Sequence, residues 1–181
     1  MIMSDLAAEI AALRGEVERL KAREAIRQSL ARYGRGQEWL DVSLMDEVFW
    51  DDADMDFGFF RGPWREYRPV LMELEARGQS TFHFLGAAQI AFEGDDRAQV
   101  ECYGLAGGRR AEATQVYGGR YMLVFERRGG VWKAAACRYV LDWTLKQPAS
   151  EVNQSLAGIN QVEGRSPQHQ WFRRMGMAAT A

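Results

Sequence analysis

The chain has 181 residues, of which 47% are hydrophobic and 27% charged, the size and composition of one globular domain. Its net charge of −2 gives no electrostatic attraction to nucleic acid, and its apolar runs are far shorter than the ~20 residues that span a bilayer. The N-terminus lacks the basic and apolar segments of a signal peptide, so we expect a cytoplasmic protein.

The first segment has the pattern of a long helix. Five apolar residues follow the alternating four- and three-residue spacing of a coiled-coil seam: Leu6, Ile10, Leu13, Val17 and Leu20. A second stripe, Ile26, Leu30 and Tyr33, is out of register with the first. We therefore expect residues 1–21 to form a helical extension that contacts another copy, in a dimer or a trimer. The alternative is one helix whose whole apolar face packs within the chain.

Glycines at positions 34 and 36 predict the end of this helix. A short helix is expected at about 41–49 and a third helix at about 64–77. Between them, apolar residues alternate with aspartates, which predicts a strand with one solvent-exposed face. The apolar residues are Ala53, Met55, Phe57 and Phe59, and the aspartates are Asp52, Asp54 and Asp56. We interpret the three aspartates as solvated rather than as metal ligands.

From Thr81 onward the apolar residues recur with a period of two. Strands are predicted at about 81–93, 98–106, 115–127 and 131–144, with glycine-containing turns between them. Helices followed by an antiparallel meander indicate an α+β domain, a curved sheet wrapped around helices, over residues 22–145. Residues 146–181 are expected to be a tail that docks in part through Trp171 and Phe172.

Metal and disulfide chemistry have little support in the sequence. Cys102 and Cys137 lie in strand-like segments without CxxC spacing, which favours two buried thiols in a reducing compartment. The two histidines are far apart and no HExxH motif is present, so we expect neither a metal nor an organic cofactor.

Three residues have the chemistry of a base, a carboxylate and a cation. His83 lies in the apolar stretch 81–86, Glu38 follows a polar stretch, and Arg138 interrupts an apolar strand in which Asp142 is its expected structural partner. Together they would suffice for proton abstraction without a cofactor. The alternative is that each is structural.

Aromatic side chains and phenols supply a candidate pocket for an aromatic or polycyclic small molecule. The candidate residues are Tyr33, Phe57, Phe59, Trp64, Tyr67 and Tyr103.

The order of elements, with several local motifs, resembles the SnoaL-like branch of the NTF2-like family over residues 22–145. The motifs are Phe49-Trp50-Asp51-Asp52-Ala53, Thr81-Phe82-His83-Phe84-Leu85-Gly86 and the hairpin 125–133. The resemblance implies a cone-shaped α+β fold and a cofactor-independent lyase that pairs a histidine with a carboxylate. The family histidine maps to His83, and its orienting aspartate to Glu38, which is one methylene longer; Asp41 is the alternative.

Family pocket positions map to Tyr33, Met55 and Arg138. The resemblance implies dehydration, or loss of formaldehyde from a lignin-derived diarylpropane diol. The same fold also hosts dehydrochlorinases, isomerases and proteins that only bind a small molecule, so fold alone does not decide the activity.

Overall fold

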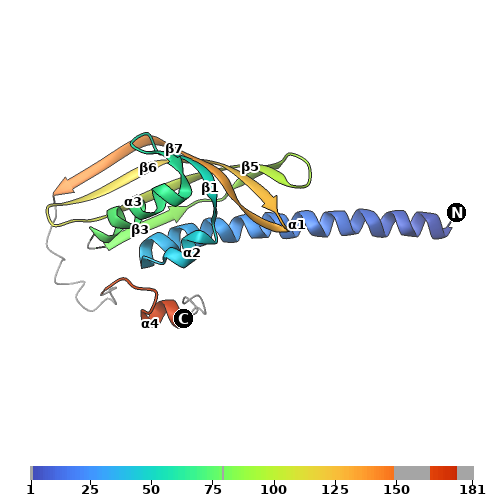
Figure 1. The fold of residues 1–181 in the computed structure, drawn as a ribbon, viewed down its shortest axis with the longest axis horizontal. Coiled ribbons are helices and arrows are strands. Elements are labelled where there is room, and N and C mark those ends of the chain that lie inside the picture. Colours follow the sequence, from blue (N-terminus) through green and yellow to red (C-terminus); the bar gives the residue numbers. More distant parts are fainter. Residues whose placement is uncertain (1, 79, 149–163, 175–181) are drawn as a thin grey trace.

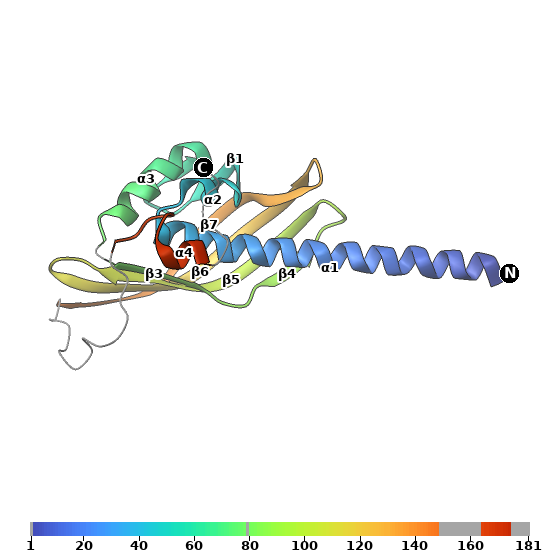
Figure 2. The same ribbon diagram turned by 90° about the horizontal axis from the view of Figure 1, so that it is seen from below.

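The computed structural model describes residues 2–78, 80–148 and 164–174. Its first helix, α1 (Ile2–Trp39), is much longer than the others, and its N-terminal half projects from the rest of the molecule (Figures 1 and 2). The two apolar stripes have different environments. Ile26, Leu30 and Tyr33 are buried in the core, whereas the seam residues at 6–20 are 42–65% exposed. The alternative in which the whole apolar face packs within the chain is therefore wrong.

The prediction that α1 ends at Gly34 and Gly36 is also wrong, because the helix continues to Trp39. A Cβ atom on Gly34 would lie 3.2 Å from the carbonyl oxygen of His83, and one on Gly36 would lie 2.6 Å from Sδ of Met45. These glycines therefore allow His83 and Met45 to pack closely against α1, and they do not end the helix. The helix ends where Leu40 adopts a φ of 57°.

The remaining elements agree with the predicted order, with shifted ends. They are α2 (Val42–Asp46), β1 (Phe49–Asp56), β2 (Arg61–Pro63), α3 (Trp64–Ala76), β3 (Ser80–Leu85), β4 (Gln89–Phe92), β5 (Arg97–Arg109), β6 (Ala113–Arg128), β7 (Val131–Pro148) and α4 (Gln170–Arg174). The predicted strand at 81–93 is two strands that lie end to end along β5, interrupted at residues 86–88.

The seven strands form one curved sheet in the order β2-β1-β7-β6-β5-β3, with β4 also paired to β5. All pairs are antiparallel except β1 with β7. The C-terminal half of α1 and α3 cover one face of the sheet, which we call the inner face (Figures 1 and 2). The opposite, helix-free face is the outer face. This is the α+β arrangement expected from the sequence.

The core lies between the inner face and the two helices. It contains Ile26, Leu30 and Tyr33 of α1, Trp64, Tyr67 and Leu71 of α3, and alternate residues of the strands. Alternation is interrupted in β7, where the register passes from Val124↔Ala136 to Phe125↔Ala134 and leaves Ala135 as a bulge. The bulge moves Ala134 to the inner face while Ala136 and Arg138 lie on the outer face.

The C-terminal segment 164–174 docks against the end of α1. Phe172 is fully buried, its ring centroid is 5.7 Å from that of Trp39, and the guanidinium of Arg35 lies over it at 4.8 Å. The expected docking of the tail through Phe172 is confirmed for this segment. Figure 1 shows α4 below α1, on the side away from the sheet.

Candidate active site

His83 lies on the inner face of β3, and its side chain is only 5% exposed. Its backbone N–H donates to Oε1 of Glu38, which reaches it from the last turn of α1. The structure therefore brings Glu38 to the backbone of His83 and not to the imidazole, contrary to the sequence-based expectation. Asp41 is not the alternative partner, because its Oδ1 accepts the N–H of Leu44 at 3.0 Å and caps α2.

The carboxylate nearest to the imidazole is Glu75, which the sequence analysis did not select. Its Oε1 lies 3.6 Å from Nε2 of His83, slightly beyond hydrogen-bond length. A usable pattern was present in α3, where Trp64, Tyr67 and Leu71 form the buried stripe at helical spacing. Glu75 is the next residue on that stripe, and a carboxylate that continues a buried stripe points into the interior.

Burial dominates the electrostatics of this pair. It lowers the pKa of His83 to about 4, with a smaller contribution from the positive charge of Arg165. It raises the pKa of Glu75, an effect that Arg165 and a hydrogen bond from Thr81 partly oppose. The imidazole is therefore neutral at pH 7, which is the form that accepts a proton.

Several buried polar atoms, two of them in this pair, have no hydrogen-bond partner among the described residues. They include Nδ1 of His83, Oε2 of Glu75 and the hydroxyl of Tyr139. Buried polar groups in folded proteins are nearly always paired with protein, water or ligand. These atoms are therefore places where a bound molecule can make hydrogen bonds.

Arg165 brings the C-terminal segment to the same place. Its guanidinium donates to the carbonyl oxygens of Glu75 and Gly78, at 2.6 and 2.9 Å, and to the hydroxyl of Thr81. It also contacts the carbonyl oxygen of Glu38 at 3.4 Å. One cation thus joins the ends of α1 and α3 to β3, and no sequence motif pointed to it.

Aromatic rings line the interior beside Glu75. The ring of Tyr121 lies 5.7 Å from that of Tyr33 and 4.9 Å from that of Tyr139, while Phe57 stacks between Tyr139 and Tyr67. Burial raises the pKa of Tyr33, Tyr67 and Tyr121, so their phenols stay protonated as donors. Tyr121 and Tyr139 were not among the predicted pocket residues.

The predicted pocket residues lie in different surroundings. Tyr33, Phe57, Trp64 and Tyr67 belong to the interior aromatic cluster, in which Tyr33, Trp64 and Tyr67 are core side chains at most 1% exposed. Met55 is fully buried in the core. Phe59 is 68% exposed at the turn after β1 and touches the cluster only at its margin.

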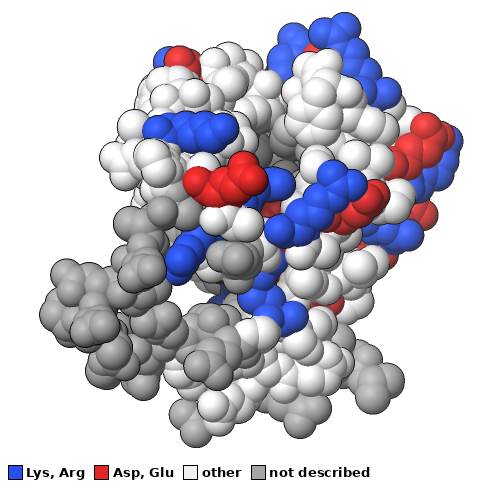
Figure 3. All heavy atoms as spheres, turned by 90° about the vertical axis from the view of Figure 1, so that its left-hand side faces the viewer, with Lys and Arg blue, Asp and Glu red and all other residues white. Residues whose placement is uncertain are grey.

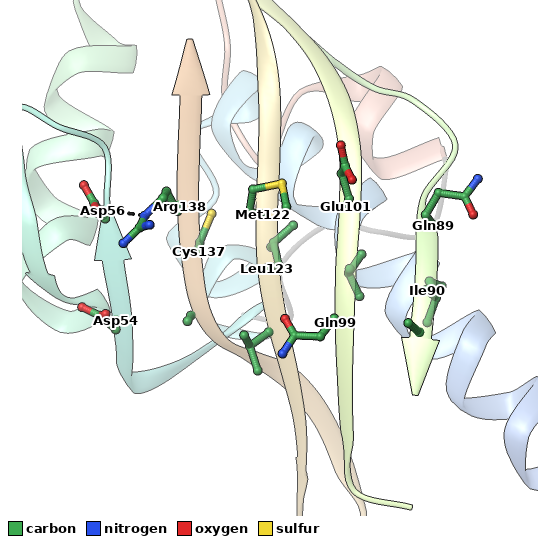
Figure 4. Close-up of a pocket in the computed structure, with 14 residues that line it drawn as sticks. Asp54, Asp56, Gln89, Ile90, Gln99, Glu101, Met122, Leu123, Cys137 and Arg138 are labelled. Carbon is green, nitrogen blue, oxygen red and sulfur yellow. Dashed lines mark hydrogen bonds and ion pairs between the residues drawn. The ribbon is translucent and has the colours of Figure 1, made fainter. Parts of the chain in front are cut away.

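Arg138 and Tyr103 lie on the outer face, opposite His83. Arg138 pairs with Asp56 at 3.1 Å, with 68% of its side chain exposed, and Tyr103 is 60% exposed. Figure 4 shows Arg138 beside Asp56 in a trough of about 540 Å³ on this face, with the helices behind the sheet. The expected partner Asp142 instead binds Arg120 at 3.1 Å. The prediction that Arg138 joins His83 in one site is wrong, because the bulge at Ala135 reverses the alternation on which it rested.

His83 adjoins two cavities. One, of about 80 Å³, lies between the ends of α3, β3 and β5 and includes Glu75 and Tyr117. The other, of about 320 Å³, lies between α1 and the segment after β3 and includes Leu30, Glu38 and Leu85. Only the larger one reaches the size usual for small-molecule sites, about 300–1,000 Å³.

Other site types have little basis in the described residues. Within 2–78, 80–148 and 164–174, no three His, Cys, Asp or Glu side chains are grouped so as to hold a metal ion. None of the helices described there is both long and apolar enough to cross a membrane. On the face in Figure 3, basic and acidic side chains are interspersed, unlike the single-sign surface typical of nucleic-acid binding.

Comparison with known proteins identifies related folds. The SnoaL-like domain profile matches residues 18–138. A type 2 hexachlorocyclohexane dehydrochlorinase (LinA) superposes with a TM-score of 0.69 and 21% identity, over 80% of this chain and 99% of that one. A candidate scytalone dehydratase from Novosphingobium aromaticivorans gives 0.67 and 18%, over 82% and 99%.

An NTF2-like protein from Novosphingobium aromaticivorans gives a TM-score of 0.59 and 26% identity, over 72% of this chain and 88% of that one. No curated protein matches the sequence. At such identities the likeness of the dehydrochlorinase and the dehydratase concerns the fold, and the chemistry must be argued from this chain's own residues.

Proposed function

Since the chain belongs to the SnoaL-like family, we propose that it is a cofactor-independent lyase for an aromatic or polycyclic small molecule, with His83 as the base. The observation that carries the proposal is a neutral, buried imidazole beside a buried carboxylate, each with an unpartnered polar atom. The names of the dehydrochlorinase and dehydratase neighbours agree with elimination chemistry.

In the proposed mechanism, His83 takes a proton through Nδ1, the ring nitrogen without a partner. Glu75 faces Nε2 and stabilises the imidazolium that forms. Glu38 holds the backbone of His83 in place.

Two bond changes fit this arrangement. In dehydration, His83 removes a C–H proton, a C=C bond forms and hydroxide leaves as water after protonation. In formaldehyde loss, His83 removes the proton of a primary hydroxyl and the adjacent C–C bond breaks. Its electrons then form the C=C bond as a benzylic hydroxyl leaves as water. Phe84, which lines the cavity of about 320 Å³ beside His83, can stack on an aryl group of either substrate.

The sizes of the two cavities limit where a substrate can bind. The 80 Å³ cavity beside Glu75 is too small for an aryl compound, and Arg165 holds the C-terminal segment against its rim. We therefore place the substrate in the larger cavity, with its reacting atoms at His83.

A second candidate function is small-molecule binding without chemistry. It is favoured by the separation of 3.6 Å between Nε2 of His83 and Oε1 of Glu75, which exceeds hydrogen-bond length. In that case His83 and Glu75 would only complement a polar group of the ligand.

We further propose that the protein works in the cytoplasm as a homo-oligomer. Both cysteines among the described residues, Cys102 and Cys137, are buried free thiols, as expected of a reducing compartment. The exposed seam of α1 supports the oligomer.

The test is detection of products by mass spectrometry. EDTA-treated wild type, His83→Ala and Arg138→Gln are incubated with aryl alcohols, diarylpropane diols and hydroxylated polycyclic compounds. We expect loss of water, or of water and formaldehyde, with wild type and Arg138→Gln but not with His83→Ala. Turnover that survives in His83→Ala would contradict the proposal. Binding without turnover by any variant would favour the second candidate.

A further inference from the structure

The exposed seam of α1 faces away from the rest of the molecule. Its members are Leu6 (52% exposed), Ile10 (42%), Leu13 (54%), Val17 (47%) and Leu20 (65%). The body contacts another side of the helix, since the guanidinium groups of Arg19 and Arg23 lie 5.3 and 5.1 Å from the ring of Phe92. At roughly 100° per residue, the centre of the seam is about 140° around the helix from Arg19. A second chain bound to the seam therefore would not collide with the rest of this chain.

We propose that α1 forms a parallel, in-register, two-stranded coiled coil with a second copy of this chain. The spacing places Ile10 and Val17 at the a positions of the heptad and Leu6, Leu13 and Leu20 at the d positions. β-Branched residues at a with leucine at d favour two strands over three or four. The seam ends after Leu20, because the next a and d positions are Glu24 and Arg27.

The charges beside the seam select the orientation. Glu9 and Glu16 occupy the g positions, and Arg14 and Lys21 occupy the e positions; all four are exposed. In a parallel pair each g residue meets the e residue of the partner's next heptad, so Glu9 faces Arg14 of the partner subunit and Glu16 faces Lys21 of the partner subunit. In an antiparallel pair g meets g and e meets e, which brings like charges together.

Lys21, which lies at the proposed interface, already forms an ion pair within its own chain. Nζ of Lys21 lies 2.7 Å from Oε1 of Glu18, with both side chains mostly exposed. An exposed pair of this kind is weak, so it does not prevent Lys21 from also contacting Glu16 of the partner subunit. The inference rests on the seam and its flanking charges and is independent of the proposed catalysis.

The stoichiometry is tested by sedimentation equilibrium on the full chain. We expect twice the chain mass for wild type and a single chain mass for Leu13→Lys, which puts a charge at the centre of the seam. The matched control is Ala8→Lys, at the exposed f position, which should stay dimeric. A wild-type monomer, a trimer, or a dimer that survives in Leu13→Lys would overturn the proposal.

The orientation is tested by oxidation of Leu20→Cys. A parallel pair places the two new thiols together, so a covalent dimer is expected, and the native thiols are buried and do not compete. In an antiparallel pair Leu20 would face Leu6 of the partner subunit. Cross-linking only in a mixture of Leu6→Cys and Leu20→Cys chains would therefore overturn the parallel arrangement.

The flanking charges are tested by reversal. The pair Glu9→Lys and Glu16→Lys should raise the dimer dissociation constant by at least about tenfold, because four attractive contacts become repulsive. Adding Arg14→Glu and Lys21→Glu should restore dimerisation. An unchanged dissociation constant after the first pair would contradict the assigned register.

Discussion

At the scale of single residues, burial of His83 makes the stability of the protein depend on pH. Its pKa is lowered from 6.5 to about 4 in the folded chain. Below pH 6.5 the unfolded chain binds this proton more readily, so the stabilisation is present above that pH and is lost as the pH falls through 4. The shift corresponds to about 3 kcal/mol.

His83→Gln should therefore lose less stability than wild type between pH 7 and 4. Urea denaturation at a series of pH values measures this. The raised pKa values of Glu38 and Glu75 act in the opposite direction, so they cannot produce this loss of stability at low pH. If stability depended on pH equally in the two proteins, His83 would not be the group responsible.

Two glutamates near His83 should have different effects when replaced. Glu38→Ala leaves the backbone N–H of His83 without its acceptor and should cost about 1–3 kcal/mol of stability. Glu75→Gln keeps the size of a side chain that faces the imidazole and should lower kcat by about 100-fold. Denaturation and kinetics on both variants separate the roles, and the reverse pattern would restore Glu38 as the catalytic carboxylate.

Replacement of Arg138 should have little effect. It is exposed and paired with Asp56 on the outer face, so Arg138→Gln should leave both stability and turnover nearly unchanged. A large loss of kcat would mean that the outer trough of Figure 4 takes part in the reaction.

At the scale of elements, the contact of segment 164–174 with the ends of α1 and α3 can be tested through Arg165. Arg165→Gln removes a cation whose charge lowers the pKa of His83, so that pKa should rise. Loss of its hydrogen bonds to Glu75 and Gly78 should also lower stability by about 2 kcal/mol. An NMR titration of the imidazole, with His169 as the second resonance, measures this pKa. An equal pKa of His83 in wild type and Arg165→Gln would show that the charge of Arg165 does not influence the imidazole.

Hydrophobic periodicity predicted where the strands lie but not where they bulge. Hydrophobic alternation located β5, β6 and β7 to within a few residues. Alternation could not locate the bulges at Ala135 and Asp142, because a bulge depends on which partner residues hydrogen-bond across the sheet. Counting by two from Ala134 therefore placed Arg138 on the wrong face.

At the scale of the whole molecule, dimerisation through α1 should stabilise the fold by mass action. Because only folded chains form the coiled coil, the thermal midpoint of wild type should rise with protein concentration. The midpoint of Leu13→Lys should not. Differential scanning calorimetry over a concentration series measures both, and equal dependence would point to association through another surface.

The sequence by itself determined the α+β class, the order of the helices and strands and the apolar seam of α1. These follow from local patterns, namely the periods of helices and strands and the chemistry of turns. Only the tertiary structure decided that Glu75 rather than Glu38 faces the imidazole, that Arg138 lies on the opposite face, and that Arg165 reaches the site from 82 residues beyond His83. Such contacts join residues distant in the chain, and which side chains meet there depends on packing and on strand register, which no local pattern encodes.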